Sequence, residues 1–334
     1  MTLPIEPFDL SLFSMNPDTK IYIAGHRGLA GSAIVRELQR QGYTNLVMRT
    51  HAELDLEDAA ATQRLFEQER PEIVFLAAAK VGGIHANNTY PVEFLMSNLQ
   101  VEASVCRAAY ATRVKRLIFL GSSCIYPRDC PQPIKEEYLL TGPLEATNRA
   151  YALAKIAGIE MCWSYNREYG TQWLAAMPTN LYGPGDHYDL NNSHVLPALI
   201  RKMHEAKIAD AKEVVLWGSG TPKREFLYVD DLANALVFLA TLDDARYNSL
   251  VAPSHCPLIN VGSGEDLTIR ELAETVAAAV GYRGKFVQDT SKPDGTMRKI
   301  MDVSKIRNLG WAPEIDLRRG IALAYKDYLN RNNE

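Results

Sequence analysis

Tyr151 and Lys155 are the two side chains whose types and spacing best suit proton transfer. Residues four apart lie on one face of a helix, so a phenol and an ammonium would meet the same reacting group. Because a neighbouring ammonium favours the phenolate, we expect the pKa of Tyr151 to be lowered towards neutrality. An ordinary amphipathic helix face is the alternative, since about one such spacing arises by chance in a chain of this composition.

A second segment, residues 121–126, supplies two serine hydroxyls and a thiol. Ser122 or Ser123 could donate a hydrogen bond to the same carbonyl or alcohol oxygen of the reacting group that Tyr151 would contact. Cys124 is either a reactive thiol or a buried structural cysteine, and the sequence leaves both interpretations open. The segment directly follows the apolar run 116–120, which predicts a strand of a parallel sheet. Ligands of such sheets gather at the carboxyl ends of the strands, so we expect chemistry at this turn.

A third group of candidates lies in the second half of the chain. Lys202, Lys223 and Arg224 supply cations, and Trp217 supplies an aromatic plate. Together they could hold a nucleotide base and a diphosphate. The alternative for Trp217 is packing in the core.

Alternating elements must position these side chains. Residues 20–24, 45–48, 73–79 and 116–120 read as strands, and residues 32–38, 92–110 and 195–205 have helical periodicity. The continuous apolar runs are typical of strands buried on both faces. The pattern predicts an α/β fold with a Rossmann-like doubly wound parallel sheet. Thr268 and Glu271 predict a capping box at the start of a further helix.

Three glycines at the end of the first strand predict a nucleotide site. Gly25, Gly28 and Gly31 stand between a strand and a helix. Glycines permit a tight turn and close backbone approach, and the helix N-terminus offers N–H groups to a pyrophosphate. The spacing matches the general dinucleotide pattern only in part.

The end of the second strand bears on the choice of cofactor. Arg27 and Arg49 could hold the 2′-phosphate of NADPH, whereas Glu53 and Asp55 could hold the free ribose of NAD. We expect NADPH. The alternative for Arg49 is a solvated surface cation.

Composition limits the function further. The 334 residues are 47% hydrophobic and 23% charged, which suits one large α/β unit or two closely joined domains. A formal charge of -4 and a pI near 6.0 argue against a general nucleic-acid binder. No apolar run approaches the roughly 20 residues that span a bilayer, so we expect no membrane partner.

Cysteine usage and the N-terminus favour the cytoplasm. The five cysteines include no Cys-x-x-Cys pair, which fits a reducing compartment without a structural zinc, and we expect no metal. The first twenty residues lack a basic region followed by an apolar one, so no secretion signal is expected.

With these residues in place, the chain resembles the extended short-chain dehydrogenase/reductases, and within them the enzymes that epimerise and reduce a GDP-bound 4-keto-6-deoxy sugar. The match runs from about residue 20 to the C-terminus. The glycine turn and the Tyr-Lys spacing are common to the whole superfamily, whereas the segments around Lys80, Cys124 and His194 are specific to this smaller group of enzymes. The resemblance rests on residues 24–31, 76–84, 86–91, 121–127, 151–155, 177–184, 192–194 and 291–295.

The resemblance implies roles for individual side chains. It makes Ser122, Tyr151 and Lys155 the reductase set. It makes Cys124 and His194 the pair that moves protons during epimerisation, and leaves open which is base and which is acid.

The resemblance also implies two sets of ligand contacts. Contacts to the GDP-sugar would come from Lys202, Trp217, Arg224 and Asp294. Contacts to NADP(H) would come from Gly25, His26, Arg27, Gly28, Leu29, Ala30, Gly31, Arg49, Ala77, Ala78, Lys80, Lys155, Pro178, Thr179, Asn180, Leu181 and His194.

The implied activity is the conversion of GDP-4-dehydro-6-deoxy-D-mannose to GDP-L-fucose, by epimerisation at carbons 3 and 5 and reduction of the 4-ketone with NADPH. One alternative is another nucleotide-sugar epimerase or dehydratase of the superfamily; a second is a non-catalytic nucleotide sensor on the same fold. His51 stands where some relatives carry an arginine, which would make the 2′-phosphate contact there weaker or pH-dependent. The sequences of residues 147–150 and 186–188 also differ from those usual in these enzymes.

We expect two domains and a homodimer. The NADP-binding Rossmann domain would comprise residues 20–178 with return segments near 225–262. Residues 179–224 and 263–334 would form a smaller α/β substrate-binding domain. Residues 1–19 are an N-terminal extension outside the resemblance. The resemblance implies pairing of two copies through helices that include the Tyr-Lys segment.

Overall fold

A parallel sheet of six strands forms the centre of the protein. The computed structural model describes residues 13–190, 193–291 and 294–331. The strand order is β2-β1-β3-β4-β5-β9, and every strand except the short β2 is wholly buried, as the apolar runs predict. The strands are β1 (Ile21–Ala24), β2 (Leu46–Val47), β3 (Ile73–Leu76), β4 (Arg116–Leu120), β5 (Trp173–Pro178) and β9 (Leu258–Val261).

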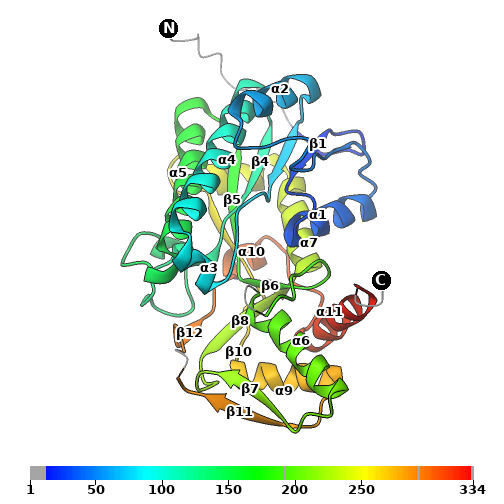
Figure 1. Cartoon of the computed structure of the whole chain (residues 1–334). Coiled ribbons are helices and arrows are strands. Elements are labelled where there is room, and N and C mark those ends of the chain that lie inside the picture. Colours follow the sequence, from blue (N-terminus) through cyan, green and yellow to red (C-terminus); the bar gives the residue numbers. More distant parts are fainter. Residues whose placement is uncertain (1–12, 191–192, 292–293, 332–334) are drawn as a thin grey trace.

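Helices cover both faces of this sheet (Figure 1). α4 packs against α2 and α5 on one face, and α1 packs against α7 on the other. This arrangement confirms the predicted doubly wound fold. The helices of this part are α1 (Leu29–Arg40), α2 (Ala59–Glu69), α3 (Ile84–Thr89), α4 (Pro91–Ala111), α5 (Arg149–Tyr169), α7 (Val229–Thr241), α8 (Asp244–Val251) and α10 (Ser304–Asn308), with short 3-10 turns η1 (Ser123–Ile125), η2 (Glu136–Tyr138) and η3 (Ala146–Asn148).

The strand order reverses between β1 and β3. The chain passes from β1 to β2 on one side and then crosses to β3 on the other side of β1. Open α/β sheets bind ligands in the crevice at such a reversal, outside the carboxyl ends of the strands. The glycine turn leaves β1 at this point, and residues 77–80 leave β3 beside it.

A smaller group of strands and helices lies below the large sheet in Figure 1. β8 pairs with β6, β10 and β12, and β7 pairs with β11. α6, α9 and α11 enclose a separate apolar core. The division into two domains stays a prediction. These elements are β6 (Asn180–Tyr182), β7 (Glu213–Trp217), β8 (Lys223–Tyr228), β10 (Asp266–Thr268), β11 (Lys285–Asp289), β12 (Arg298–Lys299), α6 (Val195–Ile208), α9 (Ile269–Val280) and α11 (Leu317–Arg331).

Side chains cap the N-termini of α2 and α9. The Asp58 carboxylate accepts hydrogen bonds from the first turn of α2. The predicted capping box of α9 is confirmed: Glu271 N–H donates to Thr268 Oγ1 at 3.1 Å, and Thr268 N–H donates to Glu271 Oε2 at 2.8 Å. α1 differs, because Gly28 begins it without a side-chain cap.

The described end of the N-terminal extension is docked on the sheet. The Phe13 N–H donates to Asp244 Oδ2 at 2.7 Å, and its ring lies 5.3 Å from the guanidinium of the fully buried Arg116. Residues 1–12 of the predicted extension lie outside the described part. Within the described part, no helix has the length and apolarity needed to cross a membrane.

Candidate active site

At two glycines of the turn between β1 and α1, the surrounding atoms leave no room for a side chain. Gly25 has φ +84°, and a Cβ there would lie 2.7 Å from the Ala78 nitrogen. A Cβ on Gly31 would lie 2.1 Å from the Gly25 oxygen. The first turn of α1 has neither a side-chain cap nor an acidic residue. It therefore offers backbone N–H groups and positive dipole to an anion, which fits the predicted pyrophosphate site.

Among the remaining residues of the turn, Arg27 adds positive charge. Arg27 is exposed, and Leu29 and Ala30 form the first turn of α1. Burial lowers the pKa of His26, with a further contribution from Arg27, so its imidazole is neutral at pH 7. Its Nδ1 atom is buried without a hydrogen bond among the described residues.

The loop after β3 is held in place by α4. The Lys80 backbone N–H donates to Asn98 Oδ1 at 2.9 Å, and Asn98 Nδ2 donates back to the Lys80 oxygen at 3.1 Å. The Lys80 ammonium forms an ion pair with Glu93. This clamp keeps Ala77 and Ala78 against the glycine turn.

The end of β2 contains the charges for both cofactor alternatives. Arg49 Nη2 lies 2.6 Å from Glu69 Oε1, so Arg49 is a paired cation and not simply a solvated one. Glu53 accepts the Thr50 N–H at 2.7 Å, and this hydrogen bond lowers the pKa of Glu53. His51 and Asp55 are mostly exposed and 3.9 Å apart. The preference for NADPH stays a prediction.

Ser122 and Cys124 lie together in the turn after β4, which packs against α5. The Cys124 N–H donates to Ser122 Oγ at 3.4 Å. Cys124 is buried, and this burial raises the pKa of its thiol, opposed by the Lys299 ammonium, a hydrogen bond with Ser122 and the Lys155 ammonium. At pH 7 the resting group is therefore a thiol.

The predicted lowering of the Tyr151 pKa is wrong for this structure. Burial of the hydroxyl raises the Tyr151 pKa strongly, and the nearby Cys124 and Glu102 raise it further, whereas a hydrogen bond with Ser122 lowers it. The spacing argument counted the ammonium of Lys155 and missed both the desolvation and the acid that faces the ammonium. A protonated phenol can still donate its proton to an oxygen that becomes negative.

Lys155 lies below Tyr151 in the protein interior. Its Nζ atom lies 5.9 Å from the centre of the Tyr151 ring and 4.6 Å from that of Phe119. It donates to Glu102 Oε1 on α4 at 3.2 Å, and both side chains are 1% exposed. The sequence argument did not identify Glu102 as part of the site.

Residues 178–181 lead from the sheet to the smaller part. Pro178 ends β5, and Leu181 lies in β6, which pairs with β8. Thr179 Oγ1 and Asn180 Nδ2 both donate to the Glu225 backbone oxygen, at 3.2 and 2.8 Å. These bonds fix the strand end where cofactor contacts are predicted.

His194 is the N-terminal flanking residue of α6. Its side chain is exposed, yet protein atoms surround the imidazole closely enough to lower its pKa by desolvation. The imidazole has no hydrogen bond with another described residue, so its pairing with Cys124 stays a prediction. Asn192, which is part of the same motif, lies outside the described residues.

The predicted GDP-sugar contacts form two groups. Lys202 Nζ lies 4.9 Å above the Trp217 ring, and the ring is 59% exposed. Asp294 Oδ1 accepts the Ser219 N–H at 2.6 Å, and Arg224 lies near enough for Asp294 to act on its charge. Gly218 beside them has φ +77°, and a Cβ there would lie 2.3 Å from Asp294 Oδ1. Lys292 and Pro293 of this segment lie outside the described residues.

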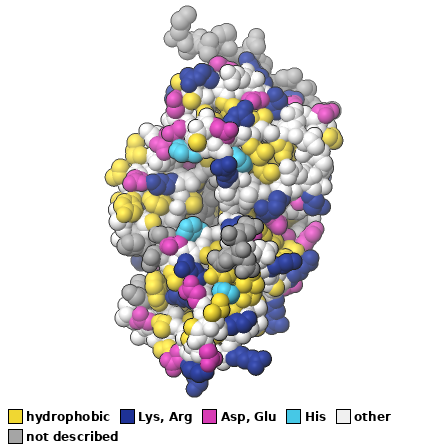
Figure 2. All heavy atoms as spheres, turned by 45° about the vertical axis from the view of Figure 1, so that its right-hand side comes forward, with side chains coloured by type: hydrophobic (Ala, Val, Ile, Leu, Met, Phe, Trp, Pro, Cys, Tyr) yellow, Lys and Arg dark blue, Asp and Glu magenta, His cyan; other side chains and the backbone are white. Residues whose placement is uncertain are grey.

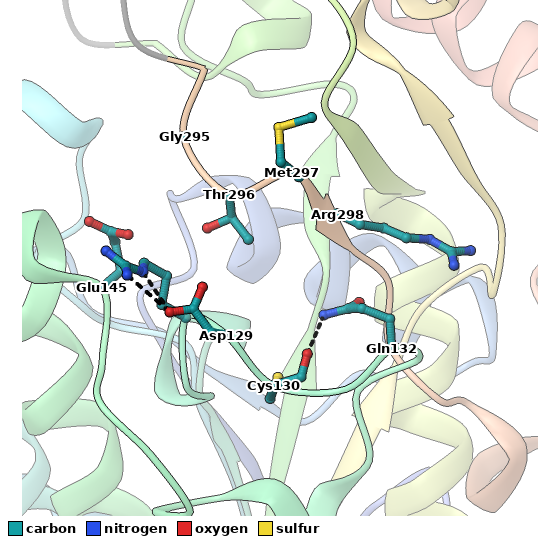
Figure 3. A pocket seen from close by; sticks show the side chains of 9 residues that line it. Asp129, Cys130, Gln132, Glu145, Gly295, Thr296, Met297 and Arg298 are labelled. Carbon is teal, nitrogen blue, oxygen red and sulfur yellow. Dashed lines mark hydrogen bonds and ion pairs between the residues drawn. The ribbon is translucent and has the colours of Figure 1, made fainter.

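A pocket of about 590 Å³ adjoins the Cys124 side of the site. Figure 3 shows Asp129 and Glu145 facing residues 295–297, whereas the Arg298 side chain points away from them, towards Asp266 at 2.5 Å. The volume suits a small ligand. The pocket is lined by Arg128, Asp129, Cys130, Gln132, Glu145, Gly295, Thr296, Met297 and Arg298.

Lys299 links this pocket to the site, and the sequence argument missed it. Desolvation lowers the pKa of Lys299, while Cys124, Cys130 and Glu145 raise it through their charges. Lys299 therefore lies near Cys124 and near Cys130 and Glu145 of the pocket lining. No sequence signal marks it, because it lies in a two-residue strand beside the exposed Arg298.

The described residues offer no metal site, and the face in Figure 2 is not dominated by one sign of charge. They contain no cluster of three or more His, Cys, Asp or Glu side chains that could hold a metal ion. On the face in Figure 2, basic and acidic side chains are interspersed.

Comparisons with known proteins agree with this geometry. GDP-L-fucose synthase 1 of Arabidopsis thaliana is 58% identical and covers 93% of each chain. GDP-L-fucose synthase of Escherichia coli K12 is 52% identical over 94% of this chain and 98% of its own. The structure of a GDP-L-fucose synthetase from Naegleria fowleri bound to NADP has a TM-score of 0.85 and 27% identity, covering 96% of this chain and 97% of that one.

The profile of the NAD dependent epimerase/dehydratase family matches residues 21–250. That range holds the glycine turn, the turn after β4, and the helices that bear Tyr151, Lys155 and His194. The chain therefore belongs to the NAD dependent epimerase/dehydratase family and, within it, groups with GDP-L-fucose synthases.

Proposed function

We propose that the chain converts GDP-4-dehydro-6-deoxy-D-mannose to GDP-L-fucose. One observation carries the proposal: the Ser122 hydroxyl interacts with both the Cys124 thiol and the Tyr151 hydroxyl. A thiol for epimerisation and a phenol for reduction therefore adjoin a single hydroxyl, so one pocket serves both steps. The identity of 58% to a GDP-L-fucose synthase over 93% of the chain supports this substrate.

Epimerisation rests on the acidity of the protons beside the 4-ketone. A base removes the proton from carbon 3, the electron pair moves to the ketone oxygen, and an acid returns a proton to the opposite face; the same exchange inverts carbon 5. We assign these transfers to Cys124 and His194. The raised pKa of the thiol and the lowered pKa of the imidazole make the resting pair a thiol and a neutral imidazole. That pair contains one group that can give a proton and one that can accept it.

Reduction follows at carbon 4. Bound NADPH supplies the hydride. Tyr151 donates its hydroxyl proton to the carbonyl oxygen as that oxygen becomes negative, and Ser122 donates a hydrogen bond to the same oxygen. The Lys155 ammonium, beneath the Tyr151 ring, stabilises the phenolate that remains.

The cofactor part of the proposal is NADPH in preference to NADH. The uncapped start of α1 would hold the pyrophosphate, and Arg27 and Arg49 would face the 2′-phosphate. Arg49 would then exchange its ion pair with Glu69 for one with the phosphate. An Arg49→Ala variant that keeps the NADPH-to-NADH preference in kcat/KM would contradict this assignment.

The substrate part of the proposal uses the exposed ring and the cations of the smaller part. Trp217 offers a face on which a guanine base can stack. Lys202 and Arg224 offer positive charge to the diphosphate. Burial lowers the pKa of each, and the Asp294 carboxylate opposes this shift at Arg224. Asp294 would accept hydrogen bonds from the nucleoside.

A second copy of the chain is the proposed partner. Val92 and Met96 on α4 and Leu153 on the adjoining α5 are 71%, 46% and 40% exposed. Such an apolar face on two packed helices suits burial in a homodimer. Sedimentation should give a dimer for the native protein and a monomer for Met96→Glu. The proposed location is the cytoplasm, in line with five free thiols.

The test uses purified protein, GDP-4-dehydro-6-deoxy-D-mannose and NADPH in heavy water. We expect NADPH oxidation together with deuterium at carbons 3 and 5 of the product. A 4-epimerase or dehydratase would instead turn over without net NADPH consumption, because those enzymes regenerate their cofactor. If NADPH is not oxidised and no deuterium is exchanged, this substrate assignment is wrong.

A further inference from the structure

The pair formed by Lys155 and Glu102 is the most enclosed ion pair of the described residues. Its two atoms, Nζ and Oε1, are 3.2 Å apart, and each side chain is 1% exposed. The two residues come from α5 and α4, which pack along their lengths. The second oxygen, Glu102 Oε2, is buried without a hydrogen bond among the described residues. A buried carboxylate with one unsatisfied oxygen is costly, so a role beyond packing is indicated.

We infer that Glu102 is a positioning residue for the reduction step: its carboxylate holds the Lys155 ammonium beneath Tyr151. The inference rests on the proposed function, because Lys155 belongs to the reductase set. Glu102 acts through Lys155 and is not expected to touch the substrate.

The surroundings explain why Lys155 needs this partner. Apart from Glu102, its ammonium faces the rings of Phe119 and Tyr151 at 4.6 and 5.9 Å. Rings attract a cation weakly compared with a carboxylate. A buried ammonium without an opposite charge tends to lose its proton. Among the described residues, Glu102 is the one acid that forms an ion pair with Lys155.

The titratable groups that face Glu102 come from both helices. They are Cys106 on α4 and Tyr151, Lys155 and Cys162 on α5. Burial raises the pKa of Glu102 to about 7, and Lys155 opposes this shift. The negative charge of Glu102 in turn favours the protonated form of Tyr151. Its removal should therefore lower the pKa of Tyr151.

The first measurement is kinetic and uses Glu102→Gln. We expect kcat for NADPH oxidation to fall about tenfold or more, since general acid catalysis contributes 10²- to 10⁴-fold. The alkaline limb of its pH profile should move to lower pH. The KM for the GDP-sugar should stay unchanged. Deuterium exchange at carbons 3 and 5 should fall far less than kcat, because the Lys155 ammonium is one of the smaller influences on the Cys124 thiol.

Two further variants separate charge from packing. Glu37→Gln makes the same change at another buried carboxylate, which Arg40 and Asn234 hold on α1, and should leave kcat unchanged. Glu102→Asp keeps the charge and should retain the alkaline limb of the native profile. If Glu102→Gln loses both exchange and thermal stability, a structural role replaces the proposed one.

A spectroscopic measurement decides the pairing without any substrate. In protein with ¹⁵N-labelled lysine, the buried ammonium should give a slowly exchanging NH₃⁺ signal, assigned by its loss in Lys155→Arg. The signal should vanish in Glu102→Gln and persist in Glu37→Gln. Its persistence in Glu102→Gln would overturn the inference. If native protein oxidises no NADPH, the proposed function fails, while this signal still decides the pairing.

Discussion

The two halves of the site differ in how far they are enclosed. Around the end of β4, Cys124 and Lys155 are buried and the hydroxyl of Tyr151 is desolvated. In the smaller part, Trp217 is 59% exposed and Asp294 is exposed. Desolvation is the largest influence on the pKa of Cys124 and of Tyr151, and the charges of their neighbours act on both as well. Among the open groups, Lys202 lies over the Trp217 ring and Asp294 acts on the charge of Arg224, and the exposed surface of the ring can contact a ligand.

The difference separates the expected kinetic effects. Groups that act on the reacting carbons gain strength from a dry, low-dielectric surrounding and should affect kcat. Groups that hold the nucleotide bind the ground state and the transition state alike, so their loss should raise KM.

Tyr151→Phe should give the largest effect. It keeps the ring but removes the proton donor, so we expect kcat for NADPH oxidation to fall about 10²- to 10⁴-fold with little change in KM. Deuterium exchange at carbons 3 and 5 should continue. Tyr165→Phe, the same change on the same helix, is the control. If deuterium exchange falls as much as reduction does, Tyr151 is needed for epimerisation as well as for reduction.

Cys124→Ala should break epimerisation about 10²-fold or more, because it removes one of the two proton carriers. The measurement is deuterium content at carbons 3 and 5 by mass spectrometry. Cys256→Ala, at a half-buried thiol in the loop before β9, should match the native protein. If Cys124→Ala exchanges deuterium at the native rate, Cys124 has a structural role and does not carry protons.

Arg224→Ala tests the open half. A charge-assisted hydrogen bond to the diphosphate is worth about 1.5–3 kcal/mol, so KM should rise roughly 10- to 100-fold while kcat changes little. Arg270→Ala, an exposed arginine of α9 paired with Glu274, is the control. A fall in kcat with an unchanged KM would show that the open half also acts on the chemistry.

Much of the fold could be predicted because its signals are local. Buried strands appear as apolar runs, and the glycine turn stands between a strand and a helix. Tyr151 and Lys155 share a helical face as their spacing predicts. The pKa of Tyr151 could not be predicted, because it depends on burial and on Glu102, which lies about fifty residues away in the chain.

Glu102 did leave a signal that the sequence argument passed over. On α4 it follows Phe94 and Asn98 at intervals of four, so it lies on the buried face of a helix. A lone acid on that face requires a cation, and Lys155 is the one that α5 supplies. Lys299 offers no comparable pattern, because its place depends on how β12 pairs with β8.

Asp186→Asn should give the smallest effect, and it tests whether burial also controls the connection between the two halves. Asp186 lies in the loop from β6 towards His194. Its Oδ1 accepts the His187 N–H at 2.7 Å, and its Oδ2 is buried without a partner among the described residues. Burial raises its pKa from 3.8 to about 7, opposed by that N–H and by Arg331, while Asp327 raises it further.

The sign of the effect follows from proton linkage. Between 3.8 and about 7 the folded protein binds more protons than the unfolded chain, so this carboxyl lowers the free energy of unfolding as the pH rises. Asn keeps the acceptor for His187 without the charge. In urea unfolding we expect Asp186→Asn to gain on the order of 1 kcal/mol over native protein at about pH 8 and much less at about pH 5. The exposed Asp210→Asn should show no such difference. If the free energy of unfolding changes equally at both pH values, the charge of Asp186 is not the cause of the change.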